Sequence, residues 1–344
     1  MSHVDVIVPC YKYAHFLRGC VESVLAQPVD VRVLIIDDAS PDHTPEVAAE
    51  LVARDERVEF RRHAVNRGHI ATYNEGLDWG TGEYMLLLSA DDLLTPGALG
   101  RAVRLMDTHP EVGFTYGRAI STDRPDPSQF KAPPGDYRWR ILSGAEFWEL
   151  SCKEAGNLVP TPTAVVRTRL QQAIGGYRKE LPHTGDLEMW LRFAVSAPVG
   201  ILDCDQAFYR VHGNNMHKDM FPSAMTVIQQ HREAFETLFR EYGDRIPDIE
   251  RMKHLAMRGT AFNALRGATR MFEQGDMDSC NKLLDVALRI FPQLRSQREW
   301  SRLRLKQALG TRLWLALRPL LDRLRGRAVL DRDPFVRSGV FPGV

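Results

Sequence analysis

Runs of apolar and β-branched residues recur along the first third of the chain and predict strands. The runs at residues 4–9 and 31–36 are almost continuously apolar, which is typical of strands buried on both faces. Further strands are predicted at residues 58–63, 83–89 and 112–117. Their alternation with helical segments indicates an α/β fold with a mostly parallel central sheet.

Segments with apolar residues at helical spacing separate these strands. One covers residues 14–26, and another ends near Gly80. Thr44 and Thr95 are each followed by a proline, so we expect each threonine to be the N-cap of a helix whose first residue is that proline.

Beyond about residue 220 the strand pattern stops, and three or four helices are predicted. We expect residues 1–220 to form the α/β domain, residues 221–326 an all-α C-terminal region and residues 327–344 a flexible tail. Residues 271–293 resemble a single tetratricopeptide-type helical hairpin, although solenoids of such repeats need several copies. A strongly basic amphipathic segment follows from residue 295, and Pro319 is expected to break its helix.

The composition excludes several classes of protein. A formal net charge of +1 gives no support to a nucleic-acid partner. The five cysteines are scattered without a CxxC pair, which argues against a zinc site or a disulfide framework. The sequence shows no secretory signal, and no segment reaches the roughly 20 apolar residues of a membrane span. A cytoplasmic location is therefore expected.

Two pairs of adjacent carboxylates follow predicted strands, Asp37-Asp38 and Asp91-Asp92. In α/β sheets, ligands bind at the carboxyl ends of the strands. Neighbouring carboxylates repel each other unless a positive charge lies close by. The residues alone leave two interpretations open: the acids begin a turn before the next helix, or they hold a divalent cation whose other face meets phosphates.

The blocks VIVPCYKYAHFLRGCVESVLAQ, LIIDDAS and NRGHIATYNEGLDWGTGEYMLLLSADD together resemble the opening of a family 2 glycosyltransferase of GT-A fold. The resemblance continues through GGY, TGDLEMWLRFA and FYRVHGNN, and it covers about the first two-thirds of the chain. It implies a nucleotide-diphospho-sugar transferase fold. The expected reaction is a metal-dependent, inverting transfer of a sugar from a nucleoside-diphosphate donor, with UDP as the expected nucleotide.

The resemblance also assigns roles to individual residues. The nucleotide-binding positions are Pro9, Tyr11, Asp38, Arg67, Gly68 and Asp91, with Asp38 expected to accept from the ring N–H of uracil. Asp92 and His212 would bind Mn²⁺ or Mg²⁺. Asp186 would be the catalytic base, although its position also suits a helix N-cap. Trp190 and Glu188 would contact the sugar or the acceptor.

Two departures from the family pattern keep an alternative open. Ser89 stands where an additional acid is common, and Gly185 stands where the residue before the catalytic acid is usually Glu. The alternative is a non-catalytic sugar-nucleotide-binding scaffold of the same fold. A dinucleotide oxidoreductase and a nucleotidyltransferase are rejected, because PCYKYAHF stands where each would have a glycine-rich loop.

The acceptor cannot be read from the sequence, and a polysaccharide, a lipid-linked sugar, a peptide or a natural product all fit. The loop at residues 124–136 is a candidate lid over the site. Three functions are open to the C-terminal helices: packing on the catalytic domain, homodimer formation, or peripheral contact with the inner face of an anionic membrane.

Overall fold

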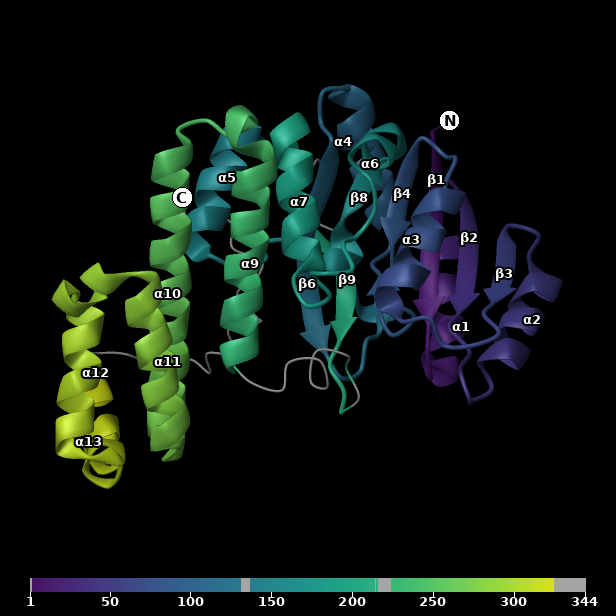
Figure 1. Cartoon of the computed structure of the whole chain (residues 1–344). Coiled ribbons are helices and arrows are strands. Elements are labelled where there is room, and N and C mark those ends of the chain that lie inside the picture. The colour runs from purple at the N-terminus through teal and green to yellow at the C-terminus, as the bar shows by residue number, and fades with distance from the viewer. Residues whose placement is uncertain (1, 131–136, 214, 216–223, 325–344) are drawn as a thin grey trace. The chain divides into compact units, whose positions relative to one another are not determined.

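The computed structural model describes residues 2–130, 137–213, 215 and 224–324, shown in colour in Figure 1. The described residues divide into two compact units. The first unit comprises residues 2–147 and 157–215, and the second comprises residues 148–156 and 224–324. The predicted boundary at residue 220 stays a prediction. The predicted tail and residues 131–136 of the predicted lid lie outside the described residues.

The first unit is built around a nine-stranded sheet with the strand order β3-β2-β1-β4-β8-β6-β9-β5, and β7 pairs with β9. The strands are β1 His3–Cys10, β2 Asp30–Asp37, β3 Val58–Arg62, β4 Tyr84–Leu87, β5 Leu93–Leu94, β6 Phe114–Thr122, β7 Trp139–Leu142, β8 Val165–Arg167 and β9 Val199–Arg210. Figure 1 shows β1 to β4 side by side in one half of the sheet.

The prediction of a mostly parallel sheet holds for one half of it and is wrong for the other. Strands β1 to β4 are mutually parallel, and β6 is parallel to β9. Strand β8 is antiparallel to both β4 and β6, while β5 and β7 are antiparallel to β9. Strand–helix alternation, which forces parallel pairing, is regular only as far as β4.

The helices of the first unit lie between these strands. They are α1 Ala14–Leu25, α2 Thr44–Arg54, α3 His69–Trp79, α4 Ala98–Thr108, α6 Thr168–Ile174 and α7 Gly185–Ser196. Helix α5, Gly144–Glu154, begins in this unit and ends in the second.

Both predicted threonine caps are wrong. The N-cap of α2 is His43, and that of α4 is Gly97. Thr95 instead donates its hydroxyl hydrogen to the carbonyl of Asp205 at 2.9 Å, and it accepts from Arg101 at 2.8 Å. A buried network with strand β9 therefore outweighs the local capping preference of this residue.

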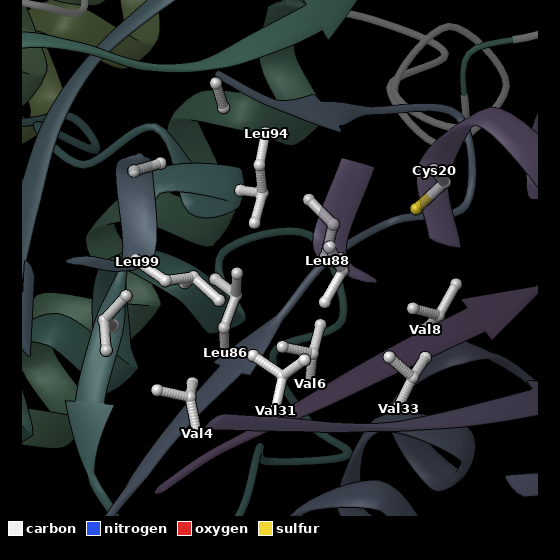
Figure 2. Packing of buried hydrophobic residues seen from close by; sticks show 14 of the residues in the cluster. Val4, Val6, Val8, Cys20, Val31, Val33, Leu86, Leu88, Leu94 and Leu99 are labelled. Atoms are coloured by element: carbon white, nitrogen blue, oxygen red, sulfur yellow. The ribbon is translucent and has the colours of Figure 1, made fainter. Parts of the chain in front are cut away.

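The main core lies on one face of the parallel half of the sheet. Val4, Val6 and Val8 alternate with residues of the opposite face along β1, and all three are fully buried. They pack with side chains from neighbouring strands and helices, among them Val31, Val33, Leu86, Cys20 and Leu99 (Figure 2).

The opposite face of β1 is covered by helix α3, which approaches very closely at Gly76. A Cβ atom on Gly76 would stand only 2.2 Å from Cγ2 of Ile7. Helices therefore cover both faces of the parallel strands, which explains their continuous apolar sequence.

The second unit consists of helices. Besides the end of α5, it contains α9 Ala224–Tyr242, α10 Ile249–Gln274, α11 Met277–Ile290, α12 Arg298–Leu309 and α13 Thr311–Leu324. Helix α10 ends at Gly275, whose φ is 85°, and the side chain of Asp276 accepts from the N–H of Ser279 to begin α11.

The predicted helix break at Pro319 is wrong. Helix α13 continues through Pro319, whereas Gly310, with a φ of 79°, separates α12 from α13. A proline removes one backbone hydrogen bond and can be carried by a continuing helix, but a positive φ cannot. Within the described residues, every helix is too short or too polar to cross a lipid bilayer.

Candidate functional site

Asp91 and Asp92 lie in the turn that follows β4, at the edge of the sheet where the parallel strands end. Only 6% of Asp91 and 3% of Asp92 is exposed. The N–H of Asp92 donates to the carbonyl of Ser89 at 3.0 Å, which closes the turn. Since β5 then pairs with β9, the two acids are placed next to the end of β9.

The end of β9 supplies the neighbours of these acids. The backbone N–H of Arg210 donates to Oδ1 of Asp92 at 2.9 Å, and its Nε donates to the carbonyl of Asp91 at 2.8 Å. His212 places Nε2 at 3.1 Å from Oδ2 of Asp91. The Arg210 guanidinium also lies 4.3 Å from the ring centroid of Phe16, so helix α1 supports the same cluster.

Because both carboxylates are buried, their ionised forms are unfavourable. Burial raises the pKa of Asp91, and the neighbouring His212 opposes that shift. The pKa of Asp92 is raised well above its ordinary value, first by burial and then by the charge of Asp91. A cation bound here would relieve both effects.

The donor set fits Mg²⁺ or Mn²⁺, which take oxygen ligands and are commonly held by one or two carboxylates together with substrate phosphates. Across the part of the chain that the structure describes, however, no group of three or more His, Cys, Asp and Glu side chains already has metal-binding geometry.

Asp38 lies at the end of β2 and organises the loop that precedes α3. Its Oδ1 accepts from the N–H of Arg67 at 2.7 Å, and its Oδ2 accepts from the N–H of Gly68 at 2.9 Å. The amide of Asn66 also donates to the carbonyl of Asp38 at 3.1 Å. Gly68 has a φ of 82°, a conformation that other residues rarely adopt.

The remaining predicted nucleotide-binding residues lie at the same edge of the sheet. Pro9 is half-buried near the end of β1, and 40% of Tyr11 is exposed in the following loop. The N–H of Lys12 donates to Oγ of Ser40 at 3.0 Å, which ties this loop to the one after β2. The guanidinium of Arg67 is directed toward Glu75, with Nη1 at 2.7 Å from Oε2.

Asp186 lies in the first turn of α7, where two hydroxyl groups hold its carboxylate. Thr161 donates to Oδ2 at 2.6 Å, and Tyr177 donates to Oδ1 at 3.1 Å. Burial raises the pKa of Asp186, while the two hydroxyl hydrogen bonds and the nearby His69 lower it. The N-cap position belongs to Thr184, so the interpretation of Asp186 as the N-cap is wrong.

The structure gives a reason for Gly185, one of the two departures from the family pattern. A Cβ atom at this position would stand 2.9 Å from Cδ1 of Tyr177. The glycine therefore makes room for the ring whose hydroxyl binds Asp186.

The charges of the four predicted site acids affect the pKa values of two nearby residues, Tyr209 and His69. The charges of Asp91, Asp92 and Asp186 all raise the pKa of Tyr209, after the larger effect of burial. Burial lowers the pKa of His69, and the charges of Asp186 and Asp38 both oppose that shift. The four acids therefore lie in one region of the first unit.

Glu188 and Trp190 are directed elsewhere. Glu188 is fully buried, and its carboxylate accepts from Arg178 at 2.7 Å and from Arg192 at 2.8 Å. Trp190 stacks on Phe114 with 5.2 Å between ring centroids. Both side chains belong to the packing of α7, and this placement lends no support to their predicted contact with sugar or acceptor.

Several site residues were not singled out from the sequence. Tyr177 stands in the GGY block, but nothing in the sequence connects it to Asp186. Thr161 lies in a short 3₁₀ segment, Thr161–Thr163, that carries no motif. His63 follows β3 and touches Asp38, a pairing that depends on strand register. Register and loop packing, rather than local sequence, bring these groups together.

Comparison with known proteins finds similarity to glycosyltransferases. Residues 5–162 match the family model described as Glycosyl transferase family 2. The curated protein named Uncharacterized glycosyltransferase EpsJ, from Bacillus subtilis (strain 168), is 29% identical over 259 residues, which cover 70% of each chain. The chain spans 35% to 63% of the length of three other curated relatives.

Two solved structures share the fold. Residues 1–349 of S. aureus TarS in complex with UDP-GlcNAc align with a TM-score of 0.63 at 16% identity, over 98% of this chain and 90% of that one. Mannosyltransferase PcManGT from Pyrobaculum calidifontis, in complex with GDP-Man and Mn²⁺, aligns with a TM-score of 0.55 at 16% identity, over 94% and 88%. The predicted GT-A type of α/β fold with a helical C-terminal region is thereby confirmed.

Proposed function

Since residues 5–162 match the family model described as Glycosyl transferase family 2, we propose that the chain transfers a sugar from a nucleoside-diphosphate donor to an acceptor nucleophile, with inversion at the anomeric carbon. The observation that carries the proposal is the gathering of four buried or half-buried acids, Asp38, Asp91, Asp92 and Asp186, in one region of the first unit. This arrangement would provide separate places for the nucleobase, for the diphosphate and for the general base that takes the proton of the acceptor.

Asp91, Asp92 and His212 would hold the divalent cation together with the donor's diphosphate. A bound Mg²⁺ or Mn²⁺ supplies Lewis-acid stabilisation of the negative charge that develops on the leaving nucleoside diphosphate. The chain's own contribution is to hold the two acids in place: the Arg210 N–H donates to the Asp92 carboxylate, the Arg210 side chain donates to the backbone carbonyl of Asp91, and His212 contacts the Asp91 carboxylate. The raised pKa values of the two acids support a cation as their missing partner.

Asp186 would take the proton from the acceptor nucleophile as that group attacks the anomeric carbon. A general base works best when its pKa lies near the working pH, and burial moves the pKa of Asp186 in that direction. The hydrogen bonds from Thr161 and Tyr177 orient the carboxylate and oppose the rise of its pKa. One base is sufficient for a single displacement, which inverts the anomeric centre.

Asp38 would accept a hydrogen bond from the base of the donor, with Pro9, Tyr11 and the Arg67–Gly68 loop around it. Uracil is the expected base, so the expected donor is a UDP-sugar. The two structural neighbours were solved with UDP-GlcNAc and GDP-Man, so both nucleotides are included in the tests. The acceptor class stays open among polysaccharide, lipid-linked, peptide and natural-product nucleophiles.

A non-catalytic scaffold of the same fold is the alternative function. Ser89 and Gly185 motivated it, yet Gly185 has a structural use, because it leaves room for the ring of Tyr177. A scaffold would have no use for a buried carboxylate held by two hydroxyl groups. We therefore favour the enzyme.

The helical unit would make peripheral contact with an anionic membrane surface. Leu305, Leu309, Leu313 and Leu315 are exposed on α12 and α13. Arg298, Arg302 and Arg312 are exposed on the same helices, and none of them has an acidic partner among the described residues. Flotation with anionic vesicles, but not with neutral ones, would support this contact. A stable homodimer in sedimentation analysis with no flotation would assign the surface to a second copy instead.

The test of the function is release of nucleoside diphosphate from UDP-sugars and GDP-sugars in the presence of Mn²⁺. Slow hydrolysis without acceptor is the expected baseline, since water can replace the acceptor. No release from any donor by a folded protein that still binds nucleotide would favour the scaffold.

A further inference from the structure

His63 is a buried histidine at the edge of the site that the proposed reaction does not use. It follows the last residue of β3, and its backbone N–H donates to the carbonyl of Asp37 at 2.9 Å. Only 8% of the residue is exposed. The position of this histidine is therefore fixed by strand β3 and by the loop that precedes α3.

The ring of His63 bridges two carboxylates. Its Nδ1 lies 2.7 Å from Oδ1 of Asp38, and its Nε2 lies 3.0 Å from Oε2 of Glu75. A ring that carries hydrogen on both nitrogens donates to both acids. Glu75 is held in turn by Arg67, whose Nη1 is 2.7 Å from the same oxygen, and Arg61 lies 3.9 Å from its other oxygen.

We propose that His63 is a positioning residue of the nucleotide pocket, which fixes the carboxylate of Asp38 and the Arg67–Gly68 turn so that Asp38 offers one acceptor position to the base. The inference rests on the proposed function, because it assumes that Asp38 meets the base of the donor. It goes beyond that function by naming the residue that limits what Asp38 can accept.

The hydrogen bonds to Asp38 show how this limit arises. A carboxylate has about four acceptor positions, two on each oxygen. Oδ1 of Asp38 accepts from His63 and from the N–H of Arg67, and Oδ2 accepts from the N–H of Gly68. One position therefore remains, on Oδ2.

One free acceptor position on Asp38 favours a nucleobase that has a single N–H donor in its ring. Uracil and thymine present one N–H between two carbonyl groups. Guanine presents a ring N–H beside an exocyclic amino group, and a carboxylate receives this pair best with both oxygens. With Oδ1 occupied, Asp38 cannot receive both donors, so His63 should favour UDP and TDP over GDP.

The test compares two variants of His63 by calorimetric titration of the full chain with UDP, TDP and GDP in Mn²⁺. His63→Leu removes both donors. His63→Asn keeps an N–H at about the position of Nδ1 and loses only the contact with Glu75. We expect His63→Leu to bind UDP at least tenfold more weakly and to lose most of its preference over GDP. His63→Asn should bind UDP within about threefold of the original chain.

The chain contains a matched control at the opposite edge of the sheet. His3 also bridges two carboxylates, with Nε2 at 2.8 Å from Asp5 and Nδ1 at 2.9 Å from Asp30, but it lies at the amino end of β1. His3→Leu should leave nucleotide affinity and selectivity unchanged. If His63→Leu does not fold, Glu75→Gln interrupts the same bridge on the exposed side, and it should weaken UDP binding two- to fivefold.

A second measurement is independent of nucleotide binding. The N–H groups of Arg67 and Gly68 donate to Asp38, so His63→Leu should speed their hydrogen exchange at least tenfold in the ligand-free protein, with His3→Leu as control. Absence of nucleotide binding by the original chain would count against the proposed function, while this exchange would still test His63. Unchanged exchange, unchanged UDP affinity in His63→Leu, or equal damage in His63→Asn would each overturn the proposal.

Discussion

Nε2 of His212 lies 3.1 Å from Oδ2 of Asp91, although 121 residues separate them in the chain. The short pairing of β5 with β9 is responsible, because Leu93 pairs with Phe208 and Leu94 with Ala207. The acids that follow β4 are thereby aligned with the residues that follow β9. The proposed diphosphate site depends on this pairing.

Asp92→Asn should stabilise the ligand-free protein at neutral pH and abolish metal-dependent nucleotide binding. Burial and Asp91 raise the pKa of Asp92 in the folded state, so the folded protein binds this proton more tightly than the unfolded chain does. The stability that this group contributes is present below its unfolded pKa and is lost as the pH rises through its folded pKa.

Asp92→Asn should raise the free energy of unfolding at pH 8, because it removes a carboxylate whose ionisation is unfavourable in the folded protein. Urea unfolding at pH 5 and pH 8 measures it, and the gain should be larger at pH 8. The amide oxygen of Asn can still accept from the Arg210 N–H. A variant less stable than the original at pH 8 would contradict the assignment of Asp92 as an unfavourably buried charge.

Asp186→Asn should lower kcat by about 10²- to 10⁴-fold, which is the usual contribution of a general base. The affinity for the donor nucleotide should stay within about twofold, because Asp186 is assigned to the acceptor. Steady-state transfer and nucleotide titration on the same preparation separate the two effects. Turnover at the original rate would remove Asp186 from the mechanism.

Tyr177→Phe should move the acidic side of the kcat–pH profile to higher pH. The hydrogen bond from Tyr177 lowers the pKa of Asp186, so its loss lets that pKa rise further and delays formation of the ionised base. A hydrogen bond to a charged group contributes about 1.5–3 kcal/mol, so its loss should displace the profile measurably toward higher pH. Thr161→Val should act in the same direction, and profiles that coincide with the original would show that these hydroxyls do not tune the base.

Gly76→Ala should destabilise the first unit without touching the site's acids. The added Cβ would stand 2.2 Å from Cγ2 of Ile7, so helix α3 or strand β1 has to move. Overpacking of this kind costs about 1–3 kcal/mol. It is partly offset by the better helix propensity of alanine, by about 1 kcal/mol. Urea unfolding measures the net change, and a variant of raised stability would contradict the close packing of α3 on β1.

The sequence was most informative where strands are buried on both faces. Strands β1, β2 and β4 lie in continuous apolar runs, and the acids that follow β2 and β4 stand out against that background. The second half of the sheet carries a weaker pattern: β9 includes Asp203, Asp205 and the buried Gln206 within one strand. Their partners lie far away in the chain, as in the pairing of Gln206 with Arg101 at 2.6 Å, so local patterns could not reveal them.

In the candidate site, too, some residues are indicated by the sequence and others are not. Asp91, Asp92, Asp186 and His212 stand in motifs, and their types predict their chemistry. The sequence is less informative for Glu188 and Trp190, because their nearness to Asp186 in the chain does not indicate which side of α7 faces the core. The hydroxyl of Thr161 and the ring of His63 have no sequence signal, since they reach the acids through tertiary packing alone.

Asp91 and Asp92 are proposed to bind a divalent cation that carries the donor's diphosphate. Calorimetric titration with UDP, TDP and GDP, each in Mn²⁺ and in EDTA, tests this proposal most directly. We expect metal-dependent binding, tightest for UDP, that is lost in Asp92→Asn and kept in Asp186→Asn. Equal binding in EDTA and Mn²⁺, or undiminished binding by Asp92→Asn, would contradict it.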